Sequence, residues 1–63
     1  MTELQKMYND MLVTLEKGIN DLEKFEDGNM SAGTRVRKTM QTTKELAQKI
    51  RVTVQEQKNA VAA

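Results

Sequence analysis

Residues 26–31 read EDGNMS, and this short segment is the one strong break in a chain of 63 residues. Gly28 suits the left-handed residue that follows a helix C-terminus, and Asn29 or Ser31 can cap a second helix. A connection this short forces the two flanking helices to lie antiparallel. We therefore predict an all-α fold, an antiparallel helical hairpin that forms one domain over residues 1–63, with helix 1 at about 3–27, the turn at 28–31 and helix 2 at about 32–59.

The first predicted helix is amphipathic. It opens with Thr2 and Gln5 at the spacing of a capping box. Beyond this start, apolar residues recur in alternating steps of four and three, interrupted only by Gly18. This seam consists of Leu4, Tyr8, Met11, Leu15, Gly18, Leu22 and Phe25, with Met7, Leu12 and Ile19 beside it. Such a stripe is wider than the seam of a two-stranded coiled coil and is typical of a helix in a bundle.

The second predicted helix repeats the rhythm with a weaker seam, which consists of Val36, Met40, Thr43, Ala47, Ile50, Val54, Gln57 and Val61. Below roughly 70–80 residues a single core supplies only about 3–5 kcal/mol, so small chains usually need disulfides, a metal or a partner chain. This sequence contains neither cysteine nor histidine. We therefore expect a homo-oligomer, a four-helix bundle dimer or a larger assembly of hairpins.

Several functions find no support in the composition. Without histidine or cysteine, and with a single serine, the chain offers no catalytic constellation and no usual zinc ligands, so we expect no enzyme, metal, cofactor or small-molecule substrate. No apolar run approaches the roughly 20 residues of a membrane span, and the N-terminus lacks a signal-peptide core. We expect no membrane partner and a cytoplasmic or nucleoid location.

Charge is distributed unevenly along the chain. Residues 1–27 carry three lysines against seven carboxylates, a net charge of −4, whereas residues 28–63 carry seven cations against two carboxylates, a net charge of +5. Such asymmetry either pairs one half with the other or directs the basic half toward an anionic partner.

The cations of the second helix form two patterns. A row at seven-residue spacing, about 10 Å apart by the helix rise, consists of Arg37, Lys44, Arg51 and Lys58. This row either pairs with acids of a neighbouring helix or follows a nucleic-acid backbone, and the row alone favours pairing. A collar of Arg35, Arg37 and Lys38 lies near the helix start, where an anion is favoured, yet Glu26 and Asp27 are close enough to neutralise part of it.

The stretch Gly28 to Lys38, GNMSAGTRVRK, followed by Glu45 to Arg51, ELAQKIR, resembles the bacterial histone-like family named for the chlamydial linker-histone-like protein. The match covers roughly residues 28–59, and the first helix agrees in pattern more than in identity. Members of that family also carry a long lysine-rich tail, whereas this sequence ends after an uncharged stretch.

The resemblance implies a DNA-binding protein that contacts the phosphates of double-stranded DNA without sequence specificity and organises or compacts the nucleoid. It implies DNA contacts from Arg35, Arg37 and Lys38, then from Lys44, Lys49 and Arg51, and a turn formed by Gly28 and Asn29. The alternative is a structural or protein-binding hairpin whose basic second helix pairs with acidic helices.

Overall fold

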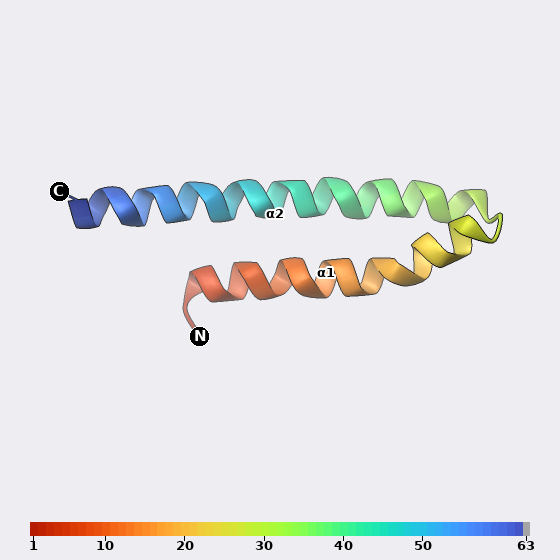
Figure 1. Cartoon of the computed structure of the whole chain (residues 1–63), viewed down its shortest axis with the longest axis horizontal. Coiled ribbons are helices and arrows are strands. Elements are labelled where there is room, and N and C mark those ends of the chain that lie inside the picture. The colour runs from red at the N-terminus through yellow and green to blue at the C-terminus, as the bar shows by residue number, and fades with distance from the viewer. Residues whose placement is uncertain (63) are drawn as a thin grey trace.

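The computed structural model describes residues 1–62 and consists of two α-helices joined by a tight turn (Figure 1). Helix α1 spans Glu3–Glu26 and helix α2 spans Met30–Ala62. No strand occurs in the described part of the chain. The helices run antiparallel, and α2 continues past the N-terminal end of α1, within an envelope of 53 × 19 × 11 Å. The predicted all-α hairpin is therefore confirmed, while its assembly into a bundle stays a prediction.

Helix α1 begins with the capping box that the sequence predicts. The Gln5 amide N–H donates to the Thr2 hydroxyl at 3.1 Å, and the Thr2 amide N–H donates to Oε1 of Gln5 at 2.9 Å. These two bonds satisfy backbone donors that have no partner within the helix.

The turn closes α1 and opens α2 with three residues. The Gly28 N–H donates to the Phe25 carbonyl at 3.0 Å and the Asn29 N–H to the Lys24 carbonyl at 2.9 Å, the pair of bonds that defines a Schellman motif. Gly28 has a φ of +103°, a backbone conformation that is energetically unfavourable for a residue with a Cβ.

Of the two candidate caps, Asn29 is the one used. Its Oδ1 accepts from the Ala32 N–H at 3.2 Å. Because Asn29 is the cap, α2 begins at Met30 and not near residue 32. At its other end α2 continues to Ala62 and not only to residue 59.

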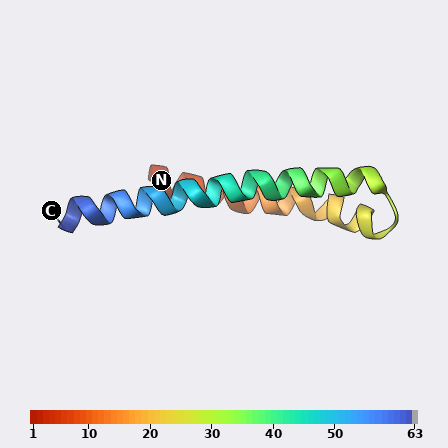
Figure 2. The same cartoon turned by 90° about the horizontal axis from the view of Figure 1, so that it is seen from above.

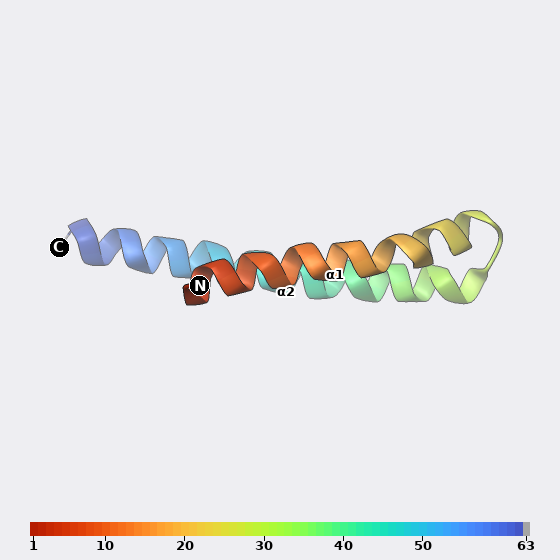
Figure 3. The same ribbon diagram turned by 90° about the horizontal axis from the view of Figure 1, so that it is seen from below.

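The two helices meet through small and medium-sized side chains. On α1 the partly buried positions are Leu4, Met7, Met11, Thr14, Gly18 and Asp21, and on α2 they are Gly33, Val36, Thr39, Thr43, Leu46, Ala47, Ile50 and Thr53. Among the described side chains, only Ala32 is fully buried. Figures 2 and 3 show the helices crossing at a shallow angle along the length of α1.

The predicted apolar stripe of α1 is divided between α2 and solvent. Met11 and Gly18 of the predicted seam are partly buried against α2, whereas Tyr8, Leu15 and Leu22 are 58%, 37% and 47% exposed. The reason is close packing, because a bulky seam would hold the helices apart.

Two glycines show how closely the backbones approach. A Cβ added at Gly18 would lie 3.0 Å from Cγ2 of Thr39, and one added at Gly33 would lie 2.7 Å from the ring of Phe25. The missing side chain of Gly33 therefore allows the close approach of α1. These contacts also fix the register of the hairpin, with Gly18 opposite Thr39 and Phe25 opposite Gly33.

Candidate nucleic-acid interface

All six cations to which the family resemblance assigns DNA contacts lie on α2 with exposed side chains; they are Arg35, Arg37, Lys38, Lys44, Lys49 and Arg51. They do not form one patch. Successive residues of a helix are rotated by about 100°, so the face of α2 that contacts α1 divides them into two sets. Arg35, Lys38 and Lys49 lie on one side of that contact face, and Arg37, Lys44 and Arg51 lie on the other.

The first set is joined by lysines of α1. Because Gly18 lies opposite Thr39 and Phe25 opposite Gly33, Lys17 is level with Met40, and Lys24 is level with the first turn of α2. The same rotation of about 100° per residue places both lysines on the side of the hairpin that holds Arg35 and Lys38. We call these four exposed residues, Lys17, Lys24, Arg35 and Lys38, the basic face. They lie within about 10 Å along the hairpin axis, whereas Lys49 lies about 16 Å beyond Lys38.

Lys17 and Lys24 were missed in the sequence because they belong to the acidic half of the chain. The signal that would have found them is their spacing of seven residues together with the short turn. A spacing of seven keeps two residues on one side of a helix, and a three-residue turn sets which residues of the two helices are level. Net charge per half hides this arrangement, since it ignores the side on which each charge lies.

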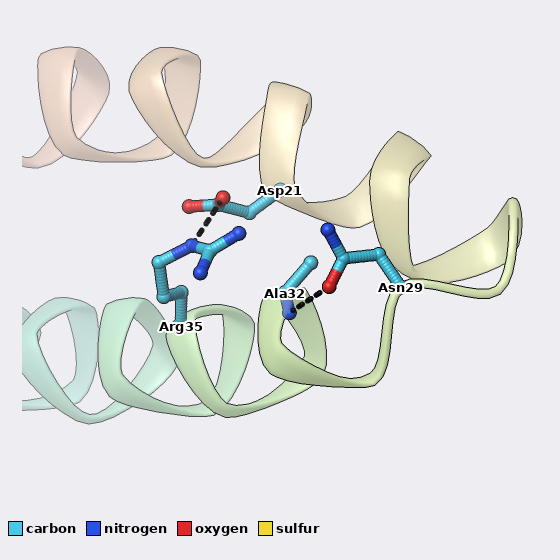
Figure 4. A network of polar contacts seen from close by, with 4 residues as sticks. All are labelled: Asp21, Asn29, Ala32 and Arg35. Atoms are coloured by element: carbon cyan, nitrogen blue, oxygen red, sulfur yellow. Dashed lines mark hydrogen bonds and ion pairs between the residues drawn. The ribbon is translucent and has the colours of Figure 1, made fainter.

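One carboxylate lies among the four cations. The Arg35 Nε–H donates to Oδ1 of Asp21 at 2.8 Å, and Figure 4 shows the two side chains pointing toward each other between the helices. It is the one ion pair among residues 1–62, and it involves neither Glu26 nor Asp27, the acids expected to neutralise the collar. An exposed pair of this kind contributes about 0–1 kcal/mol.

The ion pair leaves Arg35 able to bind an anion. A guanidinium has five N–H donors, and only the one on Nε is used by Asp21. The side chain is 48% exposed, so the remaining donors face solvent. The basic face keeps a net charge of +3 after Asp21 is counted.

The opposite side of the hairpin is apolar. A groove between the helices is lined by Leu12, Leu15, Ile19, Leu22, Val36 and Met40, and we call it the apolar groove. Gly18 and Thr39 lie at its base, and Glu16 borders it on α1. Arg37 lines a neighbouring hollow with Phe25 at the turn end. Lys58 likewise lines an apolar hollow near the other end of the hairpin. Lys44 and Arg51, between them, line a hollow of mainly polar residues on α2, which Lys49 also lines.

Residues 1–62 contain no group of acidic side chains placed to hold a metal ion. Neither helix combines the length and the apolar character that crossing a bilayer requires, over the part searched.

A family model described as histone H1-like protein Hc1 matches residues 2–60 of the chain. No curated protein and no solved structure matches it. The family match thus covers the first helix, the turn and nearly all of the second helix, and it extends beyond residues 28–59, where the resemblance was seen in the sequence.

Proposed function

Since the chain belongs to the Hc1 family of histone H1-like proteins, we propose that it binds double-stranded DNA without sequence specificity and helps to organise or compact the nucleoid. The family match over residues 2–60 is the observation that carries this proposal. The protein acts by binding and not by catalysis, and it resides in the cytoplasm with the nucleoid.

The DNA contacts are made to backbone phosphates. Lysine and arginine side chains attract phosphates of any sequence and release the counterions condensed on DNA. The basic face supports this role because it gathers four exposed cations within about 10 Å. We assign the first contacts to Arg35 and Lys38, now together with Lys17 and Lys24, and further contacts to Lys49. We expect smaller contributions to DNA binding from Arg37, Lys44 and Arg51, because they lie on the other side of α2.

Affinity needs more than one hairpin. The logarithm of the affinity falls with the logarithm of the salt concentration, with a slope of about −0.9 per neutralised phosphate. For four phosphate contacts, raising the salt concentration from 50 to 200 mM should therefore weaken binding roughly 100-fold. With a net charge of only +1, a single copy holds DNA weakly. Linked copies multiply the effect, because the second contact becomes intramolecular. The chain therefore folds as one hairpin domain that works as a homo-oligomer, a dimer or larger.

The alternative is a structural or protein-binding hairpin whose basic helix pairs with acidic helices. The observation in its favour is that Arg37 lines a hollow next to the apolar groove, where a partner helix would cover it. This alternative predicts no DNA affinity for the basic face.

A gel shift with a salt series tests the proposal, using a random-sequence duplex at 50, 100 and 200 mM salt. We expect a shift at 50 mM that is lost steeply toward 200 mM, with equal affinity for unrelated sequences. The matched variants are Lys38→Glu, on the basic face, and Lys58→Glu, on the other side of the same helix. Lys38→Glu should weaken binding on the order of tenfold or more and make the salt slope shallower by about 1, whereas Lys58→Glu should change affinity by less than about threefold.

Of two adverse results, one would contradict DNA binding and the other would contradict the basic face as its site. The first is no shift even at 50 mM salt with fully helical protein. The second is equal loss of affinity in the two lysine variants, which would leave a diffuse charge effect and no DNA-binding face.

A further inference from the structure

The hairpin exposes more surface than a compact monomer of the same mass would. The chain exposes 5219 Å². A compact monomer of 7.2 kDa is expected to expose about 4,100 Å², so the excess is roughly 1,100 Å². One partner in a stable protein–protein interface contributes about 800 Å². The excess is thus enough for one such interface.

The apolar groove is where such an interface belongs. Leu12, Ile19 and Met40 are 48%, 54% and 48% exposed, and they lie side by side along one side of the hairpin. Contiguous apolar surface of this kind on a small protein marks an interaction site. The opposite side carries the basic face, which requires solvent or DNA. The two sides therefore have different partners.

The edges of the groove carry opposite charges. Glu16 lines the groove on α1, and Arg37 lines a neighbouring hollow at the turn end. The spacing of seven residues places Lys44 on the same side of α2 as Arg37, and Glu23 on the same side of α1 as Glu16. A second copy turned by a two-fold rotation offers the complement of both edges at once. We propose that a second copy of this chain closes the apolar groove, with α2 of each copy lying on α1 of the other. This inference rests on the homo-oligomer of the proposed function and names its arrangement.

Two symmetric arrangements close the same groove, and charge separates them. If the two-fold axis runs across the helices, the turns lie at opposite ends and α2 lies on α2 of the partner. This arrangement places the cationic row of one copy opposite the same row of the other copy, and like charges in an interface are strongly disfavoured. If the axis runs along the helices, the turns lie at the same end and each cationic row meets the acidic helix of the other copy.

The register of the hairpin supports the second arrangement in detail. Gly18 is opposite Thr39, so Arg37 is level with position 20 of α1 and Lys44 with position 13. A rotation about an axis along the helices keeps these levels. Arg37 then lies three residues, about 4.5 Å along the axis, from the partner's Glu23, and Lys44 lies the same distance from the partner's Glu16. Long side chains span such an offset, and the two-fold axis produces four ion pairs.

This arrangement assigns the two sets of cations to different tasks. Arg37 and Lys44 bind the partner's acids, while Lys17, Lys24, Arg35 and Lys38 stay on the outer surface. Each dimer then has two basic faces that point away from each other.

Distances between spin labels test the arrangement, since the chain has no cysteine of its own. Ser31→Cys places a label at the turn and Asn59→Cys places one near the other end of α2; both positions are exposed. With the turns at the same end, both label pairs should lie within about 25 Å, the diagonal of a four-helix bundle plus the labels. With the turns at opposite ends, the Asn59→Cys pair should exceed about 50 Å, and that result would overturn the arrangement.

Charge exchange tests the ion pairs. Sedimentation without DNA should show that Lys44→Glu and Glu16→Lys each raise the dissociation constant of the dimer at least about tenfold, and that the double variant recovers most of the loss. Lys38→Glu, the matched control on the basic face, should leave the dimer unchanged. A helical monomer at micromolar concentration, or a double variant weaker than both single variants, would contradict the inference. Because these measurements contain no DNA, their failure is distinct from a failed gel shift.

Discussion

Gly18→Ala tests the close approach of the helices, and its effect can be worked out from one contact. In an open helix position the substitution should stabilise the protein by about 1 kcal/mol, since alanine has the higher helix propensity. Here the new Cβ would lie 3.0 Å from Cγ2 of Thr39, several tenths of an ångström closer than ordinary contact. Turning the Thr39 side chain away costs about 0.5–1.5 kcal/mol. The two terms offset each other, so Gly18→Ala alone should change the free energy of unfolding by less than about 0.5 kcal/mol.

The contact can be removed from the other side. In a Thr39→Ala background the methyl group is gone and the nearest remaining atom, the Cβ of residue 39, is 3.7 Å away. Gly18→Ala should then deliver its full stabilisation of about 1 kcal/mol, which raises the melting temperature by about 4–8 °C in a protein of this size. The double-mutant cycle should therefore give a coupling energy of about 0.5–1.5 kcal/mol.

The assay is urea and thermal unfolding followed by circular dichroism at 222 nm. All four proteins must be compared at one chain concentration, because association makes the melting temperature depend on concentration. A stabilisation of about 1 kcal/mol by Gly18→Ala in both backgrounds would refute the reasoning. It would mean that the helices do not touch at this point.

Substitutions at three further positions test the turn and the basic face. Gly28→Ala should destabilise the hairpin by about 1–2 kcal/mol, because φ is +103° at this position, and Gly28→Asn should destabilise it less. Equal unfolding curves for the unsubstituted protein and the two variants would contradict the left-handed turn. Asn29→Ala should cost about 0.5–2 kcal/mol in urea unfolding, since the Ala32 N–H loses its cap, and no loss would show that the backbone alone suffices. Asp21→Asn should change the free energy of unfolding by less than about 1 kcal/mol, because the ion pair with Arg35 is exposed. It should tighten DNA binding at 50 mM salt, because Arg35 is released and the basic face loses its one negative charge. Weaker binding in a gel shift would count against the basic face.

The hairpin itself could be predicted from the sequence, because its determinants are local. Gly28 ends one helix through its own backbone conformation, and Asn29 starts the next through its own side chain. Thr2 and Gln5 likewise form their capping box without help from the rest of the fold. The first of the two stretches that carry the family resemblance, Gly28 to Lys38, lies in and just after this turn.

The facing sides of the helices could not be predicted, because they depend on contacts between distant residues. Apolar periodicity identifies a wide stripe, but it does not say which edge of the stripe meets α2. That choice is made by Gly18, Gly33 and Ala32, whose lack of bulk lets the backbones approach. The basic face was hidden for the same reason. Lys17 and Lys24 join Arg35 and Lys38 only through the register of the two helices.

The small size of the hairpin interface has a consequence for the amount of active protein in a cell. Ala32 is the one described side chain that is fully buried, so a hairpin on its own gains little free energy from folding. If a second copy supplies the missing burial, folding and association become a single equilibrium, and the folded fraction depends on chain concentration. Well below the dissociation constant, the amount of folded dimer rises with the square of the number of chains. The amount of DNA that is covered would then depend on the rate of synthesis far more steeply than in proportion. Coverage would fall just as steeply when synthesis stops.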